Sequence, residues 1–215
     1  MRFRGFPAQA FEFYARLGAD NSRQHWAANR EVYETCVRAP LQALLDDIAT
    51  EFCSGPVSVF RPNRDIRFSA DKSPYKTHQG GFAEVADGVG YHLQLDAEGL
   101  LVSGGFHARA ASQTARFRAA VTDSGSGERL ATITNKLEAD GYTLEGEQVS
   151  TRPRGVPADH PRLDLVRRKR LTAQRRHPPS DELATPAAED IVREDWTSLA
   201  PLVTWVMSWG REGAA

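Results

Sequence analysis

Hydrophobic side chains recur every three or four positions over the first fifty residues, a spacing that predicts amphipathic helices. The first helix is expected over residues 6–17, with Gly18 ending it. Asn21 or Ser22 is expected to cap a second helix, because either side chain can accept a hydrogen bond from an unpaired backbone N–H. Pro40 lies within the apolar pattern that follows, so we expect the helix to kink or restart there.

The pattern changes after residue 56 to short runs rich in β-branched and aromatic residues, which predict strands. The expected strands and extended pieces are residues 57–60, 66–68, 91–95, 100–102, 142–144, 148–150 and 170–174. If Leu95 pairs with Leu100 in a hairpin, the odd-numbered residues of 91–95 share one buried face, and His92 and Gln94 point the other way.

Helical spacing returns in the second half of the chain. The expected helices are residues 110–121, residues 128–139 after a loop at 124–127, a short helix beginning at 159–161, and residues 185–209 with a kink or break at Pro201. Gly104 and Gly105 predict a bulge or a close approach of another segment to the backbone. This order of elements predicts a single α+β domain over residues 1–215, with an antiparallel sheet flanked by N- and C-terminal helices.

Composition is that of a globular protein, with 40% hydrophobic residues and a mean hydropathy of -0.48. No run of residues approaches the roughly 18 apolar positions of a membrane span, so a transmembrane protein is not expected. The first seven residues lack the apolar stretch of a signal peptide, which makes the cytoplasm the expected location. Cys36 and Cys53 are too few for a disulfide framework or a four-cysteine zinc site.

Charge is balanced overall, at a formal net charge of -1, but uneven along the chain. Residues 61–78 hold five cations and two anions, and residues 152–177 hold nine cations and two anions. Two basic segments can converge into one surface that attracts anions, although each can also be a solvated face paired with acidic helices. The near-zero net charge argues against a protein that coats nucleic acid.

The densest chemistry lies in the segment RDIRFSADKSPYKTH, residues 64–78. It combines four cations, two carboxylates, a tyrosine and a histidine within fifteen residues. The chain has only four lysines, and two of them, Lys72 and Lys76, fall here. A sequence that otherwise uses arginine and keeps lysine at these positions points to a need for a compact point charge.

This segment resembles the signature of the protein family called domain of unknown function 2461. The resemblance extends over about residues 6–209 and includes further pieces: Phe11–Leu17 with Asn21 and Trp26, Tyr33 with Pro40, Tyr91–Leu95 with Gly104-Gly105, and Pro153–Gly155 with Asp159–Pro161 and Arg168-Lys169. The chain departs from the family pattern at Ala70, where lysine is usual, and at Ser22, where a second asparagine is common. The family has no established activity, so the resemblance implies a fold and a site but no reaction.

We expect the segment to bind a small anionic or phosphorylated ligand, because arginine forks, lysine ammonium groups and tyrosine hydroxyls all donate to phosphate or carboxylate oxygens. The predicted ligand-binding residues are Arg64, Arg67, Lys72, Tyr75, Lys76 and His78, joined by Arg168 and Lys169 from the second basic segment. Asp65 and Asp71 are expected to orient the cations. A phosphorylated metabolite, a nucleotide or an RNA end fits this chemistry, nucleic acid is not the favoured partner, and neither a membrane partner nor a cofactor is expected.

Two other hypotheses stay open. In a metal-assisted phosphoester hydrolase, Asp65 and Asp71 with His78 or His92 would gather a metal ion, and Lys72 would stabilise the transition state. The histidines lack HxxxH or HExxH spacing, so no metal-ligand set is predicted. In a structural or interaction module, the same charges would form a buried lattice that pins the loop to the sheet. Guanidinium groups facing an open surface favour ligand binding, whereas complete burial against the two aspartates favours the lattice.

Overall fold

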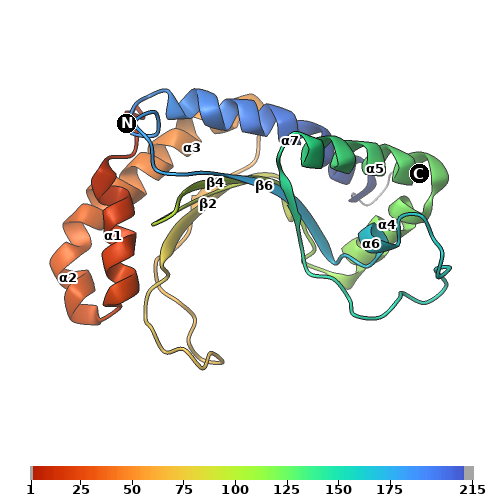
Figure 1. The fold of residues 1–215 in the computed structure, drawn as a ribbon, viewed down its shortest axis with the longest axis horizontal. Coiled ribbons are helices and arrows are strands. Elements are labelled where there is room, and N and C mark those ends of the chain that lie inside the picture. The colour runs from red at the N-terminus through yellow and green to blue at the C-terminus, as the bar shows by residue number, and fades with distance from the viewer. Residues whose placement is uncertain (1, 211–215) are drawn as a thin grey trace. The chain divides into compact units, whose positions relative to one another are not determined.

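The computed structural model describes residues 2–210 and confirms the α+β prediction. The strands form one six-stranded antiparallel sheet in the order β1-β2-β3-β4-β6-β5 (Figure 1). They are β1 (Val57–Val59), β2 (His78–Ala86), β3 (Val89–Asp96), β4 (Gly99–His107), β5 (Thr143–Glu145) and β6 (Arg170–His177). The helices are α1 (Ala8–Ala19), α2 (Arg23–Val32), the π-helical turn η1 (Tyr33–Arg38), α3 (Ala39–Phe52), α4 (Ala111–Thr122), α5 (Ser124–Ala139), α6 (Leu163–Val166) and α7 (Ala188–Gly210).

Contacts divide the chain into two compact units. The first unit comprises Met1–Ala83, His92–Val102 and Arg176–Glu194, and the second comprises Glu84–Tyr91, Ser103–Arg175 and Asp195–Ala215. Strands β2, β3, β4 and β6 and helix α7 each contribute residues to both units. Segment 64–78 therefore belongs to the first unit, and Arg168 and Lys169 belong to the second.

Three helical segments follow one another in the first unit, and their boundaries have local causes. Ser22 caps α2 by accepting a hydrogen bond from His25 N at 3.1 Å, as one of the two predicted caps. The helix then widens into the π-turn η1, in which Ala39 N–H donates to Glu34 O, five residues earlier. The wide turn ends at Arg38, so Pro40 falls in the first turn of α3, where its ring is tolerated.

The hairpin of β3 and β4 confirms the predicted alternation. Leu93, Leu95 and Leu100 are fully buried, whereas His92 and Gln94 are only partly buried. On these strands the buried leucines belong to the core of the first unit, which also takes up the apolar stripes of α1 and α3. Burying an aliphatic side chain of this size contributes about 1.5–3 kcal/mol, so this face fixes the register of the hairpin.

In the second unit, α4 and α5 pack as a pair and differ from the prediction at their junction. Residues 124–127 were expected as a loop, but they form the first turn of α5. Asp123 caps this turn by accepting from Ser126 N at 2.8 Å, which offsets the poor helix propensity of the two glycines. The predicted close approach at Gly105 is confirmed, because its φ is 145° and an added Cβ would lie 2.3 Å from Leu171 O.

The structure corrects two further expectations and adds one strand that was not predicted. The extended piece at 66–68 is wrong, because Arg67 and Phe68 form a turn instead. The hairpin of 142–144 with 148–150 is also wrong, since β5 pairs with β6, with Leu144 opposite Ala173. Finally, the sequence patterns give no hint of β2, whose residues 79–81 are buried although two of them are glycines.

Candidate functional site

Residues 60–77 leave the sheet after β1 and return into β2 as a long loop, drawn in yellow-orange below the strands in Figure 1. Backbone hydrogen bonds close its base: Lys76 N donates to Pro62 O at 2.8 Å, and Arg64 N donates to Pro74 O at 2.9 Å. Asn63 and Tyr75 face each other in an antiparallel bridge. The two limbs of the loop are therefore paired at its base, and the side chains of residues 64–73 form its tip.

The base of the loop is anchored to the helices by residues that lie more than 45 positions away in the sequence. The side chain of Asn21 donates to Tyr75 O at 3.0 Å and accepts from Tyr75 N at 3.1 Å. Trp26 stacks flat on the ring of Tyr75, with centroids 4.1 Å apart and an interplanar angle of 9°. Tyr75 was predicted to bind a ligand, and in the structure its backbone and ring hold the loop in place.

Cations at the tip of the loop are paired within the tip. Arg67 forms a two-point contact with Asp65, with Nε–Oδ1 at 2.9 Å and Nη2–Oδ2 at 2.6 Å. Arg64 forms an ion pair with Asp71, and Lys72 Nζ donates to the backbone carbonyl of residue 66 at 3.0 Å. The two aspartates pair with these arginines, so the charge of both arginines is already balanced by a carboxylate within the loop.

The tip pairs are not fully buried, so they do not form the buried lattice of the structural hypothesis, although the side chain of Arg64 is only 29% exposed. The side chains of Arg67 and Asp65 are 75% and 44% exposed. Hydrogen bonds from Arg67 lower the pKa of Asp65, and hydrogen bonds from Ser73, followed by Arg64, lower the pKa of Asp71 far below its usual range. Both aspartates therefore stay ionised over the physiological pH range.

Cations at the base of the loop have a different environment. Lys76 is partly buried, and its Nζ lies 5.7 Å from the centroid of the Phe60 ring, within the range of a cation–π contact. Burial lowers the pKa of Lys76, and the nearby guanidinium of Arg61 lowers it further. Within residues 2–210, neither Arg61 nor Lys76 makes an ion pair, and neither side chain makes a hydrogen bond.

His78 begins β2, two residues after Lys76. Burial lowers its pKa, the charge of Lys76 lowers it further, and only Asp96 acts in the opposite direction. Asp96 is itself already engaged: Arg176 Nη1 donates to it at 2.6 Å, Gln94 Nε2 at 2.9 Å, and Glu98 N at 2.9 Å. The carboxylate that acts on His78 therefore does not neutralise the base of the loop.

A chain of hydrogen bonds through the buried side chain of Gln79 holds the end of β1 and the start of β2 together at the base of the loop. Tyr33 Oη donates to Gln79 Oε1 at 2.6 Å, and Gln79 Nε2 donates to Phe60 O at 2.7 Å and Gly80 O at 2.9 Å. Gln79 is 1% exposed, and the chain links η1 to the ends of β1 and β2. Sequence reasoning missed Gln79, because a glutamine carries no motif, and it did not include Phe60 or Arg61 among the predicted binding residues.

Cations of the second basic segment contact other parts of the second unit. Arg162 donates to Val121 O at 2.9 Å and to Asp123 O at 3.1 Å, at the C-terminal end of α4. Lys169 pairs with Glu147 at 2.5 Å. Arg168 is partly buried, and its Nε has no hydrogen-bond partner within residues 2–210. Because these residues and segment 64–78 belong to different units, their convergence into one pocket stays a prediction.

The family model described as a conserved hypothetical protein, DUF2461, matches residues 9–205. The chain belongs to this family. The match covers both parts of the anchor, Asn21 and Trp26 on one side and the loop of residues 60–77 on the other. A comparison with curated proteins finds no match, and neither does a comparison with solved structures.

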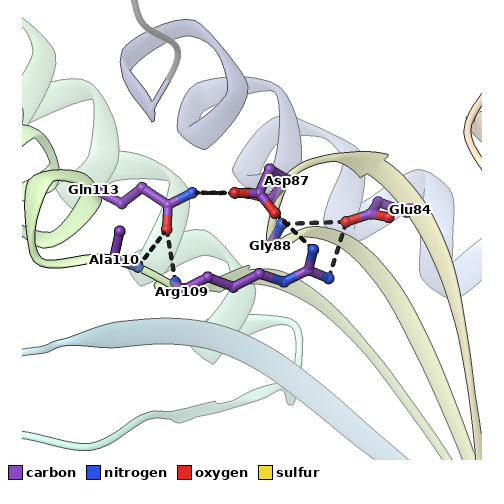
Figure 2. Close-up of polar contacts among 6 residues, drawn as sticks. All are labelled: Glu84, Asp87, Gly88, Arg109, Ala110 and Gln113. Carbon is purple, nitrogen blue, oxygen red and sulfur yellow. Dashed lines mark hydrogen bonds and ion pairs between the residues drawn. The ribbon is translucent and has the colours of Figure 1, made fainter.

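A second polar network of this DUF2461 protein lies in the second unit, at the turn between β2 and β3 (Figure 2). Arg109 contacts Asp87 at 2.6 Å and Glu84 at 3.0 Å. The Gln113 side chain accepts from the backbone N–H groups of Arg109 and Ala110, at 2.6 Å and 3.0 Å, and donates to Asp87. The one cation of this network, Arg109, has two carboxylate partners, so the network holds the start of α4 against the turn and leaves no unpaired cation for an anionic ligand.

Two observations bear on whether this DUF2461 protein holds a metal ion or crosses a membrane. Among residues 2–210, no three or more histidine, cysteine, aspartate or glutamate side chains are grouped so that they could hold a metal ion. The grouping of carboxylates that would favour the metal-assisted hydrolase is therefore not found in that part of the chain. Likewise, none of its helices in the described range is both long enough and apolar enough to cross a membrane.

Proposed function

We propose that the first unit binds a small anionic group, such as a phosphate, at the base of the loop between Arg61, Lys76 and His78. The observation that carries this proposal is the partly buried side chain of Lys76, which makes no ion pair within residues 2–210 and lies close to a second cation. A buried charge is costly unless it is paired, because water that solvated the charge has been removed. An anion at this point would supply the missing pair.

The direction of the pKa shifts supports the same ligand class. The pKa values of both Lys76 and His78 are lowered, which means that the folded protein disfavours their charged forms. An anion within hydrogen-bond distance favours the charged forms and raises both pKa values. Charge-assisted hydrogen bonds to phosphate oxygens are among the stronger polar contacts in proteins.

The proposed site is narrower than the site predicted from the sequence. Lys76 and His78 are retained, and Arg61 is added. Arg64, Arg67 and Lys72 are assigned to the internal contacts of the tip instead. A role of Arg168 and Lys169 in the same pocket remains a proposal that depends on the arrangement of the two units.

The two lysines of the loop provide a matched test. Binding of inorganic phosphate is measured by titration calorimetry on the full chain, on Lys76→Ala and on Lys72→Ala. Loss of a charge-assisted contact from a partly buried ammonium is expected to weaken binding by about tenfold or more in Lys76→Ala. Lys72→Ala removes the same charge from the same loop and is expected to bind phosphate like the unchanged protein.

Melting temperatures of the three proteins check that each variant is folded, and phosphate is expected to raise the melting temperature of all but Lys76→Ala. Equal loss of binding in both variants would show that only the overall charge of the loop matters. Absence of phosphate binding by the unchanged protein would refute the proposed function.

A further inference from the structure

An exposed aromatic ring lies directly beside the proposed anion site. Phe60 follows β1 and is 38% exposed, whereas most large hydrophobic side chains of the first unit are buried. Its main chain is held on both sides: Phe60 N donates to Gly80 O at 2.9 Å, and Phe60 O accepts from the buried Gln79 side chain at 2.7 Å. The main chain of Phe60 is therefore held against β2 at the base of the loop, and its ring does not belong to the tip.

The surroundings of Phe60 form an aromatic surface next to a cation. The ring of His92 stacks with the ring of Phe60, with centroids 6.0 Å apart and an interplanar angle of 26°. Both rings close over Gly80, where an added Cβ would lie 2.9 Å from Phe60 Cδ2 and 2.9 Å from His92 Nε2. Lys76 Nζ lies over the Phe60 ring, 5.7 Å from the ring centroid, so the positive charge is close to the aromatic surface.

We propose that the ligand of this site is a nucleoside monophosphate, whose phosphate contacts Lys76, Arg61 and His78 and whose base stacks on Phe60 and His92. This inference rests on the proposed function, because it uses the same cations for the phosphate. A planar base gains from stacking on an exposed aromatic side chain, and this gain is independent of base-specific hydrogen bonds. The ribose supplies the short spacer between phosphate and base.

The tip of the loop shows why exposure of an aromatic ring is not sufficient for such a site. Phe68 is 95% exposed, and the guanidinium of Arg67 lies 5.8 Å from its ring centroid. That guanidinium is already bound to Asp65 at two points, so no unpaired charge remains beside the ring. Phe68 thus offers a matched control for Phe60 in the same loop.

The test compares four probes: inorganic phosphate, ribose 5-phosphate, AMP and adenosine. Their affinities are measured by titration calorimetry for the full chain, for Phe60→Leu and for Phe68→Leu. We expect the full chain to bind AMP about tenfold or more tightly than ribose 5-phosphate, and to bind adenosine much more weakly than AMP. Phe60→Leu is expected to lose the preference for AMP over ribose 5-phosphate while it keeps its affinity for inorganic phosphate, and Phe68→Leu is expected to keep both.

The outcomes separate this inference from the proposed function. Equal affinities for AMP and ribose 5-phosphate, together with measurable phosphate binding, would overturn the nucleotide assignment and leave the anion site intact. A preference for AMP that survives in Phe60→Leu would also overturn the assignment to this ring. Absence of binding of both phosphate and AMP would remove the proposed function together with the inference.

Discussion

The tip and the base of one loop carry the same kinds of charged residues and use them differently. At the tip, Arg64 and Arg67 each have an aspartate partner, and both aspartates are exposed to solvent. At the base, Arg61 and Lys76 have no such partner within the described residues, and Lys76 is partly buried. The comparison shows that the density of charge along a sequence does not locate a binding site. What matters is which charges remain unpaired after folding.

The difference has a local cause. Asp65 and Asp71 each accept a backbone N–H two residues further along, from Arg67 at 3.2 Å and from Ser73 at 2.9 Å. These short turns direct the carboxylates back toward the tip, where the arginines lie within reach. At the base, the carboxylate that acts on His78 comes from another strand and is held by Arg176.

The largest change in the free energy of unfolding is expected when the residue that anchors the base of the loop is replaced. Trp26 is 8% exposed and contacts the rings of Tyr33 and Tyr75 at centroid distances of 4.7 Å and 4.1 Å. Trp26→Ala is expected to lower the free energy of unfolding by about 3–5 kcal/mol, because it removes a buried aromatic side chain and leaves a cavity. Chemical denaturation measures this change.

Phe68→Ala is the corresponding substitution at the tip. Because the ring is 95% exposed, the free energy of unfolding is expected to change by no more than about 0.5 kcal/mol. If Trp26→Ala proved as mild as Phe68→Ala, the claim that the base is anchored to α2 would be wrong.

A change of pH is expected to have an intermediate effect on the free energy of unfolding. The pKa of His78 in the folded protein lies below the ordinary value of 6.5, so below pH 6.5 the unfolded chain binds more protons at this residue than the folded chain. The contribution of His78 to stability is therefore complete above pH 6.5 and is lost as the pH falls, by at most about 1.4 kcal/mol per pH unit. His78→Gln is expected to reduce this slope.

Phosphate sharpens the pH measurement, because an anion beside His78 favours the imidazolium form and should reduce the loss at low pH. His107, in the second unit, also has a lowered pKa, caused by burial and by Arg170. Its contribution is expected not to respond to phosphate, so His107→Gln serves as the control. An equal response of both histidines to phosphate would point to a general salt effect.

The smallest effect is expected at the tip pairs. Arg67 and Asp65 are both exposed, and exposed ion pairs contribute little to stability because water and salt screen them. Arg67→Ala is expected to leave the melting temperature and phosphate affinity unchanged within replicate error. A clear fall in melting temperature would favour the structural hypothesis for the whole loop.

Patterns with a strong local cause were predictable from the sequence. The Ser22 cap and the hairpin of β3 and β4 depend on neighbouring residues and on an alternation that one buried face enforces. Strand β2 was missed because Gly80 and Gly81 are buried in it without contributing side chains to the pattern. The pairing of β5 with β6 was missed because the partner strand lies far along the chain, where no local turn indicates it.

The candidate site was only partly predictable for the same reason. The sequence singled out segment 64–78, which lies within the part of the chain that the family model matches. The sequence did not show which cations pair with an aspartate, because that pairing depends on the turns at Asp65 and Asp71 in the tip. It also did not show that Asn21 meets Tyr75, 54 positions away, or that the buried Gln79 supports Phe60.

The π-turn at Tyr33–Arg38 has a consequence for how the molecule tolerates change. A turn of this kind accommodates one more residue than an α-helical turn. Deleting one residue there would return the turn to α-helical geometry, and the segments on either side would keep their relative rotation. Deleting one residue within α3 would instead rotate everything that follows by about 100°, so a one-residue deletion should be far less damaging in the π-turn than in the regular helix after it.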